Sequence, residues 1–297
     1  MHKVIFYSLF IFTGLICISF TSSEISPFPL SKSSLLWKIE GQNINEECYL
    51  FGTMHRIEKD FFIFPKKLEK LVSKSDLILM ELSKIPTQSE SLPLITLKNG
   101  SFFDFFNEVQ TDSILDWANR EMKLDEKSFR TIFYKMKPFV ALQAAIQIQF
   151  SGKIESYEKR FYDISKDKKI ETIGLENIEQ QMSFFDNLSK SDQAEMVMES
   201  IRDSKKSIRL LKKMEEVYNR QNVDSLYLLI QEDGGVLAKK QQEFLDNRNK
   251  NWIPKIKSNM QNKKCFIAVG AGHLGGENGI IRLLQKEGFY LTPINLN

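Results

Sequence analysis

Short apolar runs and longer amphipathic stretches occupy different parts of this chain. Runs of four to six residues, bounded by polar, glycine or proline residues, predict β-strands at Leu35–Ile39, Cys48–Phe51, Leu77–Leu82, Ile170–Ile173, Cys265–Val269 and Phe289–Thr292. Apolar residues at helical spacing predict helices at Pro65–Lys74, Pro138–Phe150, Ile178–Leu188, Ser191–Tyr218 and Glu243–Lys257. The strands therefore cluster toward the two ends, and residues 100–260 are mainly helical.

This distribution predicts an α/β fold. We expect a central, mostly parallel sheet built from the N- and C-terminal segments, with a large helical insertion in the middle. The sequence shows no Pro/Gly/Ser-rich linker and no internal repeat. Residues 24–297 are therefore predicted to form a single domain, which is long enough to bury one large core without a disulfide.

The first 23 residues have a different pattern. A basic start, His2-Lys3, is followed by an apolar run over residues 4–20 and by the small residues Thr21, Ser22 and Ser23. This order is typical of a secretory signal peptide, so we predict a cleaved segment at 1–23 and a periplasmic or secreted protein. An uncleaved anchor is the alternative, because the apolar run approaches the length of a short transmembrane helix. Membrane association is expected only in that case.

Composition and charge exclude one class of partner and narrow the chemistry. The 297 residues are 42% hydrophobic and 27% charged, which is a globular composition. Forty-one Lys and Arg against 38 Asp and Glu give a net charge of +3, too balanced for nucleic-acid binding. Without the signal peptide, the chain keeps two histidines, His55 and His273, and two cysteines, Cys48 and Cys265.

Both remaining histidines follow a predicted strand in the same local pattern. The two runs are Gly52-Thr-Met-His55 and Gly270-Ala-Gly-His273. Ligand sites in open α/β sheets form where strands end, and glycine lets the backbone approach a ligand closely. Gly52, Gly270 and Gly272 are therefore candidate substrate contacts. Each histidine could instead bond locally at its strand end, but the shared pattern favours a common site.

Two carboxylates are placed to complete such a site. Glu81 follows the run Leu77-Ile-Leu-Met80, and Glu176 follows Ile173-Gly-Leu. A hydrolytic metal site usually adds a carboxylate to its histidines and leaves a position for water. Either glutamate could instead be an ordinary strand-edge or helix-capping charge.

Five segments, in order along the chain, resemble the motifs of the TraB/GumN family. They are Tyr49-Leu-Phe-Gly-Thr-Met-His55, Ile78-Leu-Met-Glu-Leu82, Gly174-Leu-Glu-Asn-Ile-Glu-Gln-Gln181, Arg248-Asn249 and Val269-Gly-Ala-Gly-His-Leu-Gly-Gly276, with a later Gly288-Phe-Tyr290. The family includes the Tiki proteins, described as metal-dependent proteases. The resemblance implies an active site of His55, Glu81 and His273, with manganese or cobalt as the metal.

The resulting hypothesis is metal-assisted hydrolysis of an amide in a peptide or protein substrate. The two histidines and Glu81 are the predicted ligands of a divalent ion, for which zinc is also possible. Glu176 is a further ligand or the general base, and Arg248 and Asn249 are candidate catalytic residues, with Arg248 facing a substrate carboxylate or the developing oxyanion. The alternative is a non-catalytic protein that binds or sequesters a pheromone-like peptide in the same cleft.

Strand parity gives an expectation for the cysteines. Cys48 lies four residues before Gly52, whereas Cys265 lies five residues before Gly270. In parallel strands with aligned ends, this difference places the two thiols on opposite faces of the sheet. We therefore expect free, buried cysteines.

Overall fold

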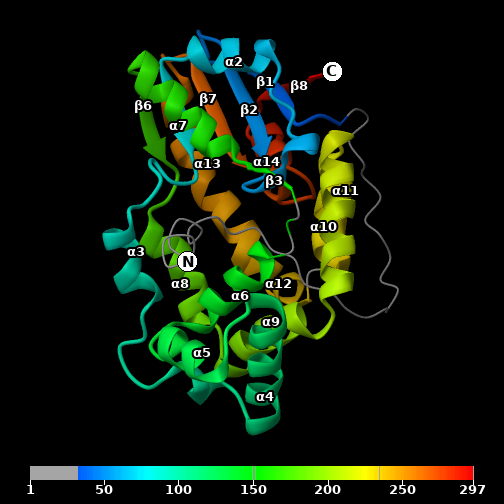
Figure 1. The fold of residues 1–297 in the computed structure, drawn as a ribbon. Helices are drawn as coiled ribbons and strands as arrows, with labels where there is room; N and C mark the ends of the chain where they lie inside the picture. The colour runs from blue at the N-terminus through cyan, green and yellow to red at the C-terminus, as the bar shows by residue number, and fades with distance from the viewer. Residues whose placement is uncertain (1–32, 149, 151, 234, 297) are drawn as a thin grey trace.

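The computed structural model describes residues 33–148, 150, 152–233 and 235–296, so the predicted signal peptide lies outside the described residues. Six strands form one sheet in the order β6-β4-β7-β2-β1-β8 (Figure 1). Their bounds are β1 Leu36–Glu40, β2 Cys48–Thr53, β4 Leu77–Met80, β6 Glu171–Gly174, β7 Cys265–Gly270 and β8 Tyr290–Ile294. A separate two-stranded sheet joins β3 (Ile57–Glu58) to β5 (Ile154–Glu155).

The centre of the main sheet is parallel. Strands β6, β4, β7 and β2 run in the same direction, and β1 is antiparallel to both β2 and β8. The predicted mostly parallel α/β sheet, built from both ends of the chain, is confirmed. The C-terminal ends of four neighbouring strands consequently lie along one edge.

Helices cover both faces of this sheet, which explains why β2 and β7 are apolar without interruption and buried at every position. On one face, α7 (Tyr157–Lys168) packs Phe161 against Phe51 and Phe266, with ring centroids 5.8 and 5.2 Å apart. On the other face, the thiol of Cys48 points to the carbonyl of Met260 in α13 (Asn247–Met260). Alternate residues of each strand therefore belong to two different helix layers.

The middle of the chain is mainly helical, as predicted, and its helices α4, α5, α6, α8, α9 and α12 gather below the sheet in Figure 1, whereas α7 and β6 lie at the sheet itself. The remaining helices are α2 Lys66–Ser73, α3 Gln88–Ile95, α4 Glu108–Trp117, α5 Glu126–Phe133, α6 Pro138–Gln147, α8 Ile178–Asn187, α9 Lys190–Arg202, α10 Ser204–Asn219, α11 Val223–Asp233, α12 Gly235–Lys239 and α14 Ile280–Lys286. Within the described residues, no helix combines the length and the apolarity needed to cross a lipid bilayer.

One predicted helix, Ser191–Tyr218, is two helices. The break lies at Asp203, whose carboxylate accepts the backbone N–H of Lys206 at 2.8 Å and caps the start of α10. An aspartate that satisfies an orphan N–H competes with helix continuation, and nothing in the surrounding charged pattern marks that choice.

The register of β2 and β7 contradicts the predicted placement of the two cysteines on opposite faces of the sheet. Cys48 pairs directly with Cys265, and Thr53 pairs with Gly270, so the two strand ends are staggered by one residue. Directly paired residues of parallel strands share a face, so the thiols are neighbours. Both cysteines are nevertheless free and buried, as expected.

Candidate functional site

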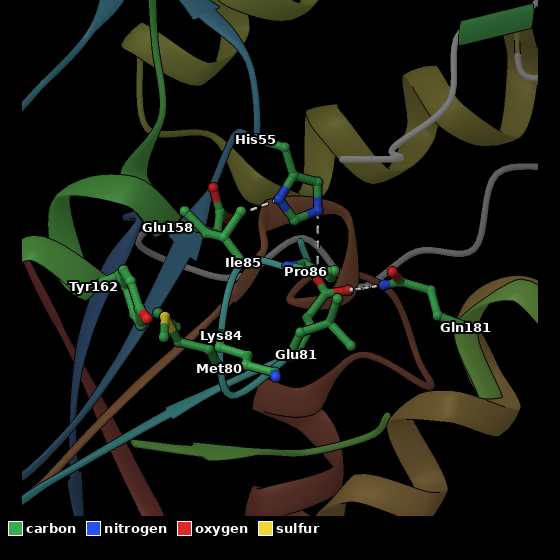
Figure 2. Close-up of a pocket in the computed structure, with 11 residues that line it drawn as sticks. His55, Met80, Glu81, Lys84, Ile85, Pro86, Glu158, Tyr162 and Gln181 are labelled. Atoms are coloured by element: carbon green, nitrogen blue, oxygen red, sulfur yellow. Dashed lines mark hydrogen bonds and ion pairs between the residues drawn. The ribbon is translucent and has the colours of Figure 1, made fainter. Parts of the chain in front are cut away.

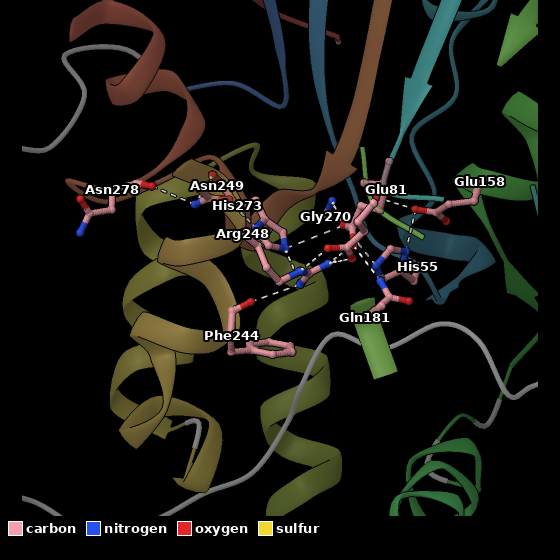
Figure 3. A network of polar contacts seen from close by, with 12 residues as sticks. His55, Glu81, Glu158, Gln181, Phe244, Arg248, Asn249, Gly270, His273 and Asn278 are labelled. Atoms are coloured by element: carbon pink, nitrogen blue, oxygen red, sulfur yellow. Dashed lines mark hydrogen bonds and ion pairs between the residues drawn. The ribbon is translucent and has the colours of Figure 1, made fainter. Parts of the chain in front are cut away.

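The polar residues that follow the four parallel strands converge at the edge of the sheet. Glu81 comes directly after β4, His55 and Glu176 follow β2 and β6 by two residues, and His273 lies three residues beyond β7. Figure 3 shows His55, Glu81 and His273 in one polar network with Arg248, which extends from α13. Glu176 joins this network through its ion pair with Arg248. The structure thus brings together five residues predicted from the sequence.

His55 is held by a carboxylate that the sequence did not reveal. Its Nδ1–H donates to Oε1 of Glu158 at 2.7 Å (Figure 2), and the hydroxyl of Thr53 donates to the same oxygen at 2.6 Å. Because Nδ1 is used in this way, Nε2 points toward Oε1 of Glu81, 3.7 Å away. This buried Nε2 has no hydrogen-bond partner among the described residues.

His273 is oriented in the same manner by an amide. Its Nδ1 lies 2.6 Å from Oδ1 of Asn249, whose Nδ2 donates to the carbonyl of Asn278 at 2.9 Å. That donation fixes the amide, so Oδ1 accepts and Nδ1 of His273 carries the proton. Nε2 then accepts from Nη1 of Arg248 at 3.2 Å and lies 3.9 Å from Oε1 of Glu81.

Arg248 joins the two carboxylates. Its Nη2 donates to Glu81 at 2.7 Å, and its Nη2 and Nε donate to the two oxygens of Glu176 at 2.6 and 3.0 Å. Glu81 also accepts the backbone N–H of Gly270 at 2.8 Å and the amide of Gln181 at 3.2 Å. Since Arg248 provides planar, forked donors, it holds both buried carboxylates in fixed positions.

The surroundings shift the pKa values of the two histidines in opposite directions. Burial lowers the pKa of His55, but the charges of Glu158 and Glu81 outweigh it and raise that pKa to about 9. Burial and the neighbouring Arg248 together lower the pKa of His273 to about 3. These shifts favour the protonated form of His55 and the neutral form of His273 in the metal-free site, so an ion bound at His55 would have to displace the proton of Nε2.

The two glutamates on Arg248 also differ. Burial opposes ionisation of Glu81, but Arg248 and the other donors lower its pKa to about 2. For Glu176, burial outweighs the attraction of Arg248, so its pKa is raised above the ordinary value. Two carboxylates with pKa values pushed apart are the usual arrangement for an electrostatic role and a proton-transfer role.

The side chains of His55, Glu81 and His273 offer the types of donor atom that bind a divalent ion. With Arg248 bound to Glu81 and His273, however, these atoms lie too far apart to share one ion. The two Nε2 atoms face one oxygen of Glu81 at 3.7 and 3.9 Å, compared with about 3.4 Å between ligand atoms in a tetrahedral site with bonds of about 2.1 Å. Metal-binding imidazoles donate their other N–H to an acceptor, as both do here. No three His, Cys, Asp or Glu side chains in the described part of the chain are arranged to hold an ion. Metal binding would thus require the guanidinium to leave Nε2 of His273.

The three predicted substrate-contacting glycines have local explanations. A Cβ on Gly52 would lie 2.7 Å from Leu274 and 3.1 Å from the backbone of Ala271, so close packing favours glycine there, whereas one on Gly272 would meet only the flexible end of Ile230, at 2.6 Å. Gly270 uses its N–H to hold Glu81. Substrate contact at these three positions stays a prediction.

A cavity of about 50 Å³ opens beside the site (Figure 2). It is lined by His55, Met80, Glu81, Leu82, Lys84, Ile85, Pro86, Glu158, Tyr162, Gln181 and Ala268. His273, Arg248 and Glu176 are not among the lining residues, so the cavity lies on the His55 side of Glu81.

Two residues of the network were not singled out from the sequence. Glu158 lies in the first turn of α7, two residues after the N-cap Ser156, where acidic residues commonly stabilise a helix, so no chemical signal distinguished it. Gln181 belongs to the segment that resembles a family motif, and that membership was the signal available for it.

Comparison with known proteins agrees with the motif pattern. A family model described as the TraB/PrgY/gumN family matches residues 35–293. Searches of curated proteins and of solved structures returned no match.

Proposed function

The chain belongs to the TraB/PrgY/gumN family, and from that premise we propose that it is a metal-dependent hydrolase that cleaves amide bonds in peptides or proteins outside the cytoplasm. His55, Glu81 and His273 hold the ion, with manganese or cobalt favoured by the family resemblance and zinc possible. The export of the chain rests on the signal-peptide pattern at residues 1–23.

One observation supports this proposal most strongly. Both imidazoles turn Nε2 toward the same oxygen of Glu81, while their Nδ1 atoms are held by Glu158 and Asn249. A histidine that served only to cap its own strand would not need this shared orientation. Outer partners that fix tautomer and ring position are the usual accompaniment of metal-binding histidines.

The side chains of the chain have distinct tasks in the proposed reaction. When bound, a divalent ion lowers the pKa of water and polarises the scissile carbonyl. Glu176, whose pKa is raised by burial, accepts the proton of the attacking water and passes it to the leaving amine. Arg248, already placed between the two carboxylates, stabilises the negative charge that develops on the carbonyl oxygen. Asn249 keeps His273 in the tautomer that presents its lone pair.

Metal-resolved mass analysis of the purified protein tests the proposal, together with cleavage of a peptide pool. We expect wild type to bind manganese, cobalt or zinc and to cleave peptides, and His55→Ala and His273→Ala to lose both properties. Arg202→Met, at a surface ion pair with Glu195, is the matched control and should keep both. A folded wild type that stays metal-free throughout titration with all three ions would overturn the proposal.

A second candidate function rests on Arg248. Its guanidinium already provides positive charge to Glu81 and Glu176 and a donor to His273, so these three residues are satisfied without an ion. This arrangement favours a non-catalytic protein that binds or sequesters a peptide. Recovery of intact peptide after tight binding, from a protein that contains no metal, would distinguish this function from hydrolysis.

A further inference from the structure

The cavity beside Glu81 has mostly apolar walls. Met80, Leu82, Ile85, Pro86, Tyr162 and Ala268 provide most of its lining. Three of its polar residues already have partners: Glu158 binds His55, Gln181 donates to Glu81, and Lys84 pairs with Glu90. An occupant therefore meets apolar surface, and a polar group placed there would lose its hydrogen bonds to water.

The volume of the cavity limits what can enter. A dry cavity of about 150 Å³ accommodates benzene, which has six carbon atoms, so each carbon needs roughly 25 Å³. A cavity of about 50 Å³ thus has room for about two carbon atoms. The single carbon atom of an alanine side chain fits this space, the three of valine slightly exceed it and need the exposed mouth at Ile85, and a phenyl ring does not fit.

The space depends on one small residue in β7. Ala268 pairs with Phe51 of β2 and Met80 of β4, and Phe266, two residues earlier, occupies the same face of the sheet. Phe266 fills its position by packing on Phe161 of α7. Ala268 leaves the corresponding volume unfilled, next to the site.

The outer wall is an exposed apolar residue. Ile85 follows β4 and Glu81 along the chain and is 42% exposed, although it is a large aliphatic side chain. An exposed apolar residue at the mouth of an apolar cavity is typical of a surface that contacts a ligand. Its exposure also means that truncation should affect folding little.

We propose that this cavity is the substrate subsite next to the scissile amide, that it accepts one small aliphatic side chain, and that Ala268 and Ile85 set its size. The proposal rests on the proposed function for the position of the amide at Glu81. It defines the substrate class as peptides with alanine or valine beside the cleaved bond, in preference to leucine or aromatic residues.

A pool of eight-residue peptides with randomised positions tests the subsite by two readouts. Immobilised protein retains the peptides that bind, and mass spectrometry identifies both the retained sequences and any cleaved bond. Wild type should enrich alanine and valine over phenylalanine at one position by about ten-fold or more, because single methylenes in an apolar pocket change discrimination by roughly 10–200-fold. Ala268→Leu should remove the preference for valine over glycine, and Ile85→Ala should extend it to leucine.

Ile148→Ala is the matched control, since Ile148 is 40% exposed and lies outside the cavity lining. It should show the wild-type profile. The subsite is refuted by a pool with no position selective for side-chain size, or by one profile shared by wild type, Ala268→Leu and Ile85→Ala. If Ala268→Leu does not fold, the exposed Ile85→Ala variant decides alone. Selective retention without cleavage would refute the peptidase and support the subsite, whereas cleavage without selectivity would do the opposite.

Discussion

Substitution of Arg248 by methionine removes the guanidinium between Glu81 and Glu176 while keeping a long side chain. The three side chains are 12%, 6% and 7% exposed, so water compensates little for the lost pair. Removing one partner of a buried ion pair costs about 3–5 kcal/mol, because the remaining charge is left uncompensated. We expect Arg248→Met to lower the free energy of unfolding by about that amount, out of roughly 5–15 kcal/mol for a typical domain.

The loss of the guanidinium in Arg248→Met should destabilise Glu176 more than Glu81. Glu81 keeps the N–H of Gly270 and the amide of Gln181, whereas Glu176 loses donors at 2.6 and 3.0 Å from Arg248. Neutralising Glu176 in the variant should therefore relieve part of the penalty. The double variant Arg248→Met/Glu176→Gln is expected to recover about 1–3 kcal/mol.

Urea unfolding followed by circular dichroism measures these differences, provided that the dependence on denaturant is the same for each variant. Arg202→Met is the control: Arg202 makes a forked pair with Glu195 on the surface and is 54% exposed, so its loss should stay below about 1 kcal/mol. A loss of less than about 1 kcal/mol for Arg248→Met, or no recovery in the double variant, would refute the reasoning. If Arg248→Met cannot be purified folded, Arg248→Lys keeps the charge without the fork and should show a smaller loss.

Three other variants test separate parts of the structure. Glu158→Ala removes the acceptor that orients His55, so manganese affinity should fall by about 10–100-fold in a metal titration. Glu215 is fully buried, one of its oxygens has no hydrogen-bond partner among the described residues, and burial raises its pKa. A raised pKa means that wild-type stability falls as the pH rises above about 4.3, so Glu215→Gln should be more stable by about 1–3 kcal/mol at pH 7 and equal at pH 4 in urea unfolding. Gly52→Ala places a Cβ 2.7 Å from Leu274 and should lower the unfolding free energy by about 1–3 kcal/mol.

Each of these variants has a counterpart outside its environment. Glu179→Ala is the control for Glu158→Ala, and Glu216→Gln is the control for Glu215→Gln, because both control carboxylates are exposed. Gly152→Ala is the control for Gly52→Ala, because its Cβ would make an ordinary 3.4 Å contact. They should stay within about 0.5 kcal/mol of wild type in stability, and the first should keep wild-type metal affinity. Equal effects in a variant and its counterpart would show that the named contact has no special role.

The sequence predicted the sheet and the strand-end residues because both depend on local pattern. Buried parallel strands are continuous apolar runs, and the polar residues that follow them must lie at the sheet edge. His55, Glu81, Glu176 and His273 were accessible to this reasoning. Arg248 was accessible only through its resemblance to a family motif, since a helical arginine beside charged residues otherwise indicates a solvated face.

The features that the sequence missed depend on distance and register. Glu158 meets His55 across 103 positions of the chain, and its local context is that of a helix start. Cys48 and Cys265 are neighbours on the same face because β2 and β7 are offset by one residue. Such an offset moves every side chain of one strand to the opposite face relative to the expected register. The order of apolar and polar residues along one strand contains no information about its register with a neighbouring strand.

The direct pairing of β2 with β7 also determines when the site can exist. His55 and His273 follow hydrogen-bonded neighbours that are more than 200 residues apart in the chain, and the helical half is made between them. During synthesis, His55 cannot meet His273 until almost the whole polypeptide has emerged, because β7 lies between β2 and β4 in the sheet. Pairings of such long range form slowly and close late. The candidate site therefore assembles only with the final steps of folding, and a chain interrupted before β7 can contain most of the helices without the assembled site.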